Sequence, residues 1–175
     1  MKITKEKLAD WNACSGGVEF FNKHFHSGEA NYQDVLDALA NENEAGYASW
    51  LMKKAGSEDT VIEVDEINTD KSFFFAGTIK VKGLISVTGY LMAGDGIKAG
   101  WSIEAGDGIK AGWSIEAGGG IRAGWSIEAG NGYGIFAGLR IRISDWKIYS
   151  SVIANTKPAN LISGFWACKD EDQKK

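Results

Sequence analysis

The chain has 175 residues, of which 44% are hydrophobic, and its formal net charge is −4. This length can bury the core of one domain, or of one domain with a small appendage. The cysteines, Cys14 and Cys168, lie outside any Cys-x-x-Cys spacing, which excludes a disulfide framework or a four-cysteine zinc site. We interpret both as buried or unreactive thiols. An apolar leader, a membrane-length apolar run and a basic stripe are missing, so we expect a cytoplasmic protein without membrane or direct nucleic-acid contact.

The first third of the sequence predicts helices. Thr4 is a suitable N-cap for a first helix, and Asn31 is a suitable N-cap for a later one. Gly56 follows two lysines and provides a stop signal. We therefore expect residues 1–56 to form three or four short helices that pack as one module and close the N-terminal end of the repeat region.

From about residue 61 the periodicity changes to six residues. A large apolar side chain recurs at Val61, Ile67, Phe73, Ile79, Ile85, Leu91, Ile97, Ile103, Ile109, Ile115, Ile121 and Ile127. A second apolar or small residue follows two positions later, and glycine is frequent between these pairs. Residues two apart share one face of a strand, so each hexad supplies a short strand with two inward side chains and a corner. This pattern is typical of a β-helix, which we expect over residues 57–144.

The charged residues decide how many hexads form one coil. With three hexads of about 18 residues per coil, opposite charges stack on neighbouring strands in the pairs Lys98–Glu116, Glu104–Arg122 and Lys110–Glu128. With two hexads per coil, like charges would stack, and Trp101, Trp113 and Trp125 would form one ladder. We therefore predict a mainly β protein with a three-sided β-helix of about five coils. A two-sided coil stays open as the alternative, and the handedness is not encoded in this pattern.

The C-terminal part is less regular. The insertion at residues 131–134 shifts the phase by two residues, after which Ile135, Ala137, Ile141 and Ile143 resume the inward pattern. Residues 145–168 are apolar and are expected to cap the coil or to form a homodimer contact. The candidate interface residues are Trp146, Ile148, Tyr149, Phe165 and Trp166. Residues 169–175 are expected to be a disordered tail.

No residue set predicts catalysis, a cofactor or a metal, so we do not expect an enzyme. Histidine occurs only at His24 and His26, and although Cys14 could join them as a third ligand, we interpret them as a surface pair. The carboxylates of the repeat fall on different faces and do not form a general acid–base pair. An acidic edge is the candidate protein-binding site and consists of Glu58, Asp59, Glu63, Asp65, Glu66 and Asp70.

Two resemblances bear on function. The segment at residues 77–100, GTIKVKGLISVTGYLMAGDGIKAG, resembles the β-helical core of bactofilins, which polymerise end to end as bacterial scaffolds. Bactofilins carry disordered tails, whereas this chain has a helical head. That head, with KITKEKLADWNACSGGVEFFNKHF and YASWLMKKAG followed by repeats, is similar to small proteins of enterobacterial phages and prophages.

Proteins of this phage type are suspected of acting against host defence, including as anti-CRISPR inhibitors. The resemblance implies a non-enzymatic inhibitor that binds a host defence complex, with a CRISPR effector as the suspected partner. The alternative is a self-assembling scaffold of the bactofilin kind.

Overall fold

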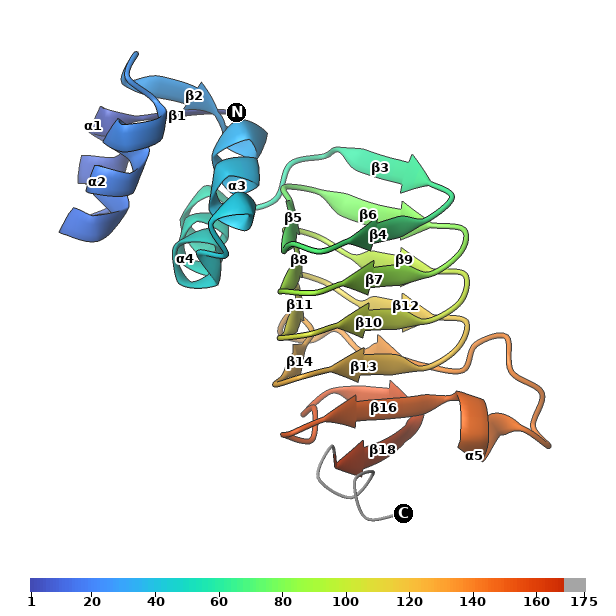
Figure 1. Cartoon of the computed structure of the whole chain (residues 1–175). Coiled ribbons are helices and arrows are strands. Elements are labelled where there is room, and N and C mark those ends of the chain that lie inside the picture. The colour runs from blue at the N-terminus through green and yellow to red at the C-terminus, as the bar shows by residue number, and fades with distance from the viewer. Residues whose placement is uncertain (169–175) are drawn as a thin grey trace.

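The computed structural model describes residues 1–168 and shows a helical head beside a long β-solenoid (Figure 1). The head begins with a short strand and four helices interrupted by a second strand. Its elements are β1 (Lys2–Thr4), α1 (Lys5–Asp10), α2 (Ser15–His24), β2 (Glu29–Asn31), α3 (Tyr32–Asn41) and α4 (Ala45–Ala55). The predicted number of helices is confirmed, but the antiparallel pair of β1 and β2 was not expected. Three-residue strands are too short to show a periodicity in the sequence.

The predicted helix ends are largely confirmed. The Thr4 hydroxyl accepts a hydrogen bond from the Lys7 backbone N–H at 3.3 Å and so caps α1. Asn31 occupies the N-cap position of α3, but its side-chain amide donates to the Asp34 carboxylate instead of capping the helix. Gly56 ends α4 with a φ of 77°, a conformation that glycine adopts without steric cost.

The solenoid is built from parallel strands on three faces, each named here by its first strand. The β3 face holds β3 (Val61–Val64), β6 (Thr78–Val81), β9 (Ile97–Ala99), β12 (Ile115–Ala117), β15 (Ile135–Phe136) and β17 (Leu161–Ser163). The β4 face holds β4 (Ile67–Thr69), β7 (Ile85–Val87), β10 (Ile103–Ala105), β13 (Ile121–Ala123), β16 (Ser151–Ala154) and β18 (Phe165–Cys168). The β5 face holds β5 (Phe73–Phe75), β8 (Leu91–Ala93), β11 (Ile109–Ala111) and β14 (Ile127–Glu128).

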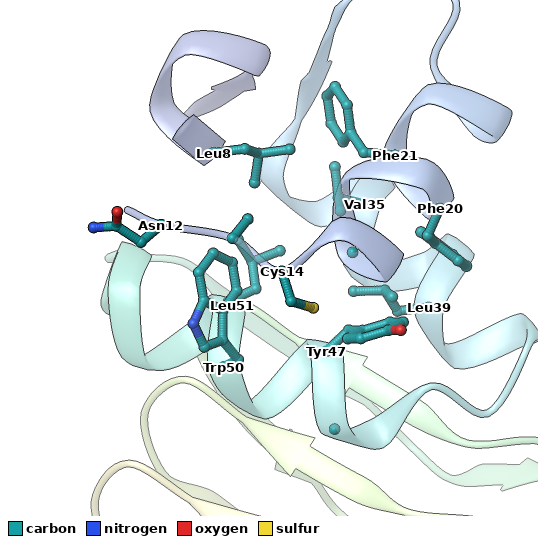
Figure 2. A pocket seen from close by; sticks show the side chains of 13 residues that line it. Leu8, Asn12, Cys14, Phe20, Phe21, Val35, Leu39, Tyr47, Trp50 and Leu51 are labelled. Atoms are coloured by element: carbon teal, nitrogen blue, oxygen red, sulfur yellow. The ribbon is translucent and has the colours of Figure 1, made fainter. Parts of the chain in front are cut away.

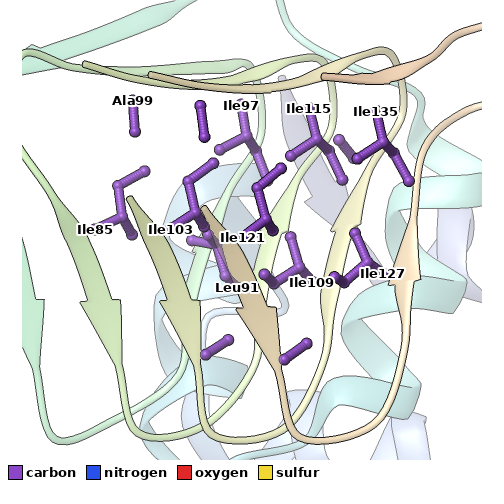
Figure 3. Packing of buried hydrophobic residues seen from close by; sticks show 14 of the residues in the cluster. Ile85, Leu91, Ile97, Ala99, Ile103, Ile109, Ile115, Ile121, Ile127 and Ile135 are labelled. Carbon is purple, nitrogen blue, oxygen red and sulfur yellow. The ribbon is translucent and has the colours of Figure 1, made fainter. Parts of the chain in front are cut away.

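The three-sided winding is confirmed by the strand register. Ile97 pairs with Ile115, a residue 18 positions later, and the same interval joins the next strands along the chain. The alternative with two sides is excluded, because it would pair residues 12 apart. The inward isoleucines of all three faces meet in one core (Figure 3), and Ile85, Ile103 and Ile115 are completely buried. The solenoid makes about six turns, one more than predicted.

The predicted charge stacking is present on two faces. The Lys98 ammonium lies 2.9 Å from Glu116, and the Lys110 ammonium lies 3.5 Å from Glu128. The third predicted pair, Glu104 and Arg122, is opposite in register. Among the described residues these two side chains form no ion pair within 4 Å. The alternation of charge over residues 98–128 therefore identifies the vertical partners of these six residues, whereas one coil earlier two like charges, Lys80 and Lys98, lie opposite each other in register.

The first turn departs from the predicted phase. Val61 is 51% exposed, and the inward residues of β3 are Ile62 and Val64, with Ile62 opposite Ile79. The prediction for Val61 was wrong, because the corner before β4 is one residue shorter than the later corners. Phe73 keeps the predicted inward position and, half-buried, fills the N-terminal end of the core.

The helical head lies against the β5 face, not over the end that it was expected to close (Figure 1). Phe74 and Met92 point outward from this face and are buried among head residues. The Gln33 side chain bonds to the backbone on the same face, donating to the Phe74 carbonyl at 2.8 Å and accepting from the Ala76 N–H at 2.9 Å. An apolar residue at the outward position of a repeat strand therefore marks where the head packs.

The C-terminal part confirms the predicted phase shift but not its continuation. Ile115 pairs with Ile135, 20 residues later, so the insertion adds two residues to this coil. After Gly138 the chain leaves the solenoid, so the predicted inward positions of Ile141 and Ile143 were wrong: Ile141 is half-buried outside the solenoid core, and Ile143 is 96% exposed. The excursion over residues 139–150 includes the short helix α5 (Trp146–Tyr149) and ends where β16 returns to the β4 face. The predicted disordered tail at 169–175 lies outside the described residues.

Candidate protein-binding surface

The predicted acidic edge is spread around the first turn of the solenoid. Glu58 is half-buried and bonds to the N-terminal amine of Met1, whereas Asp65 accepts a hydrogen bond from Lys82 at 2.8 Å. This hydrogen bond, and then the lysine charge, lower the pKa of Asp65 below its ordinary value. Glu63 lies opposite Lys80 in register. The remaining members, Asp59, Glu66 and Asp70, are exposed, and the six acids do not meet on one face.

The three repeat tryptophans occupy three different corners of the solenoid, as predicted. Trp101 follows β9, Trp113 follows β11 and Trp125 follows β13, and each ring is at least half exposed. Trp113 stacks on Tyr133, with ring centroids 5.3 Å apart and planes 6° from parallel. These rings therefore do not form one aromatic platform.

Six exposed apolar side chains lie on chain segments that connect the β3 face to the β4 face. We call these segments the corner surface, and its apolar members are Leu84, Trp101, Leu139, Ile143, Ile148 and Tyr149. The first two lie on the connections β6–β7 and β9–β10, and the others lie on the excursion that leaves the solenoid at the same corner (Figure 1). Large exposed apolar patches on a soluble domain are characteristic of interaction sites.

Backbone contacts hold the excursion against the corner. The Leu139 N–H donates to the Ala117 carbonyl at 3.2 Å, and the Arg140 N–H donates to the Gly118 carbonyl at 2.9 Å. Gly138 has a φ of 75° and leaves room for Ser150 and Trp146, since an added Cβ would lie 2.2 Å from the Ser150 Cβ and 2.9 Å from the indole nitrogen of Trp146. Contacts within the chain therefore hold the excursion against the solenoid.

Basic side chains accompany the apolar ones. Arg140, Arg142 and Lys147 are exposed on the excursion, and Asp145 is the one acidic residue within residues 139–150. Arginine and aromatic residues are enriched in the central parts of protein interfaces. The corner surface thus combines apolar area with positive charge, on the C-terminal side of a chain whose first turn is acidic.

The predicted interface residues divide between two roles. Ile148 and Tyr149 are exposed on the corner surface, and Phe165 is 49% exposed at the C-terminal end. Trp146 and Trp166 are half-buried and pack within the chain. The backbone of Phe165 lies beside the residue that follows Tyr149, because the Phe165 N–H donates to the carbonyl of Ser150 at 3.0 Å. Leu84, Trp101 and Leu139 were missed as members of this surface, since the sequence alone does not place them at one corner.

The residues considered for a metal site have other partners. His24 lies 2.9 Å from the Glu42 carboxylate, and His26 contacts the Asn22 carbonyl at 3.0 Å. Within residues 1–168 no cluster of three or more histidine, cysteine or acidic residues could hold a metal ion. Cys14 is exposed and Cys168 is half-buried, and both are free thiols.

Residues 1–58 match the family described as the YdhT N-terminal domain. The matched segment is the helical head and ends just before β3, so the boundary of the match agrees with the boundary of the fold. Neither a curated protein nor a solved structure matches the chain. Over the described part of the chain, no helix is both long enough and apolar enough to span a bilayer.

Proposed function

We propose that this protein acts by binding another protein through the corner surface. The observation that supports the proposal is that the connections between the β3 and β4 faces carry six exposed apolar side chains, together with the exposed Arg140 and Arg142. The regular strands of the solenoid hold this surface in place by parallel pairing on both sides of the corner. The chemistry is that of recognition: apolar anchors flanked by cations fit a partner with an apolar, acidic groove.

The target that we propose is a bacterial defence complex, with a CRISPR effector as the first candidate. This step depends on the similarity of the head and repeats to small phage and prophage proteins. In this role the protein is a cytoplasmic inhibitor that blocks its target without turnover.

A plasmid-interference assay tests the proposal in cells with an active CRISPR system. Expression of the chain should raise the recovery of a targeted plasmid, and the purified chain should bind the effector complex. Trp101→Asp should lose both effects, because it places a charge in the apolar surface. Trp125→Asp is the matched control, since this tryptophan is similarly exposed on a different corner. Unchanged plasmid recovery with the wild-type chain, or equal loss with both variants, would contradict the proposal.

A second candidate function is self-assembly, and one observation favours it. β3, β4 and β5 each stand last in their sheets, so the N-terminal end offers backbone groups for another strand layer. The acidic first turn and the basic C-terminal part carry opposite charge. Sedimentation velocity distinguishes the possibilities: filaments that dissolve at high salt favour a scaffold, whereas a monomer, or a closed homodimer that leaves the corner surface exposed, favours the inhibitor.

A further inference from the structure

A pocket opens in the helical head (Figure 2), which lies against the β5 face and away from the corner between the β3 and β4 faces (Figure 1). Its volume is about 350 Å³, and its lining comes from α1, α2, α3, α4 and the turn between α1 and α2. The exposed residues Asn12, Cys14 and Gly46 mark the opening. The buried floor is formed by Leu8, Phe21, Val35, Leu39 and Leu51.

The lining is uncharged. None of the described residues around this pocket is an acid, a base or a histidine. The polar groups are the amide of Asn12, the hydroxyl of Tyr47, the indole N–H of Trp50 and the thiol of Cys14. Burying a charge without a partner costs far more than an apolar contact returns, so a charged ligand does not fit the floor. The walls select an uncharged molecule with few polar atoms.

The volume of the pocket limits the size of the ligand that it can hold. An apolar cavity of about 150 Å³ is enough to hold benzene, and this pocket has more than twice that volume. One phenyl side chain from a partner protein would therefore leave more than half of the space empty, without the contacts that favour burial. The rings of Phe20, Tyr47 and Trp50 line the space, and aromatic rings pack well against other rings.

We propose that the helical head binds an uncharged aromatic small molecule of two to three rings. A pocket of this size and character, with few polar groups at its opening, has the features of small-molecule sites in proteins. All of its lining residues fall within residues 1–58, so the proposed site belongs to the segment that matches the YdhT N-terminal domain.

Gly46 provides a way to close the pocket without disturbing the fold. It is the second residue of α4, and a Cβ added there would meet nothing within 4 Å. Glycine inside a helix costs about 1 kcal/mol relative to alanine. A larger residue at this position should therefore be tolerated by the head, and because Gly46 lies at the opening of the pocket, its side chain should narrow that opening.

Fluorescence titration of the full chain with N-phenyl-1-naphthylamine tests the proposal. This probe is uncharged, has two ring systems and brightens in an apolar environment. We expect saturable binding to one site, about tenfold or more weaker in Gly46→Leu because the leucine narrows the opening of the pocket. Lys54→Leu is the matched control, since it adds the same side chain to an exposed position of α4 outside the pocket, and it should bind as the wild type does.

Labelling of Cys14 locates the bound probe. In a Cys168→Ser background, the probe should slow maleimide modification of Cys14, which lines the pocket. Binding to exposed tryptophans elsewhere would leave this rate unchanged. Equal affinity in Gly46→Leu and the wild type, absence of saturable binding, or unprotected Cys14 at saturating probe would each overturn the proposal. Far-UV circular dichroism of both variants verifies that the fold is retained.

Discussion

Two glycines in one corner of the solenoid should respond oppositely to alanine. Gly94 and Gly96 flank Asp95 between β8 and β9. A Cβ on Gly94 would lie 2.1 Å from the Ala76 carbonyl oxygen of the preceding coil, whereas a Cβ on Gly96 would lie 3.5 Å from its nearest neighbour, the Ser114 carbonyl oxygen. The sequence agrees, because Ser114 occupies the position of Gly96 in the next coil and carries a side chain there.

The expected sizes follow from these distances. Cβ atoms essentially never approach other atoms within 3.0 Å, so Gly94→Ala must separate two coils by about 1 Å at a point where the Gly94 N–H bonds to the Phe75 carbonyl at 2.9 Å. Overpacking of this kind costs about 1–3 kcal/mol. At about 2–4 °C per kcal/mol for a chain of this size, the melting temperature should fall by about 2–12 °C. Gly96→Ala should instead raise it by about 1–4 °C, through the lower entropy of the unfolded chain.

Thermal unfolding followed by far-UV circular dichroism measures both effects. Gly96→Ser serves as a further control, because it copies the residue that the next coil uses. Equal melting temperatures for Gly94→Ala and Gly96→Ala would refute the reasoning, because an added Cβ clashes with the preceding coil at Gly94 and makes only an ordinary contact at Gly96.

Three further predictions concern the packing and charge of the solenoid. Phe74→Ala should destabilise the attachment of the head by about 3–5 kcal/mol, because this side chain is 1% exposed, and hydrogen exchange should show faster opening of the head than of the solenoid. Lys110→Glu should lower stability by about 0.2–1 kcal/mol, because its vertical neighbours are Glu128 and the uncharged Met92, and adding Glu128→Lys should restore it in chemical denaturation. Lys82→Gln should raise the pKa of Asp65 toward its ordinary value in a carboxylate NMR titration. Because the folded pKa of Asp65 is lowered, its pairing stabilises the fold above the ordinary pKa and is lost as the pH falls through the folded value.

The regular part of the fold was predictable because every repeat has the same pattern of two inward apolar side chains with one outward residue between them. Charge at the outward position alternated in sign, and only an odd number of sides brings opposite charges together, as Lys98 and Glu116 show. The departures occur where a residue breaks the repeat. Val61 fits the six-residue spacing by number, but the length of its corner places Ile62 inside instead.

The candidate surface was harder to predict than the coil. Ile148 and Tyr149 were identified from their apolar character. The excursion that carries them was not predicted, because Ile143 fits the repeat pattern in the sequence although it lies outside the solenoid. The six acids were conspicuous in sequence, yet neighbours one coil away engage Asp65 and the first turn disperses the others. The position of the excursion and the dispersal of the acids both depend on contacts between residues 17 or more positions apart, which a local sequence pattern does not predict.

The sequence nearly copies itself every 12 residues, whereas one coil takes 18. Gain or loss of one such copy would leave the inward isoleucines in phase while rotating everything downstream by two-thirds of a turn. The helices would keep their orientation, and the excursion around α5 would point in a new direction. Three added copies would complete two full turns and restore the present orientation. The number of copies therefore selects one of three relative orientations of the helical head and the excursion about the solenoid axis.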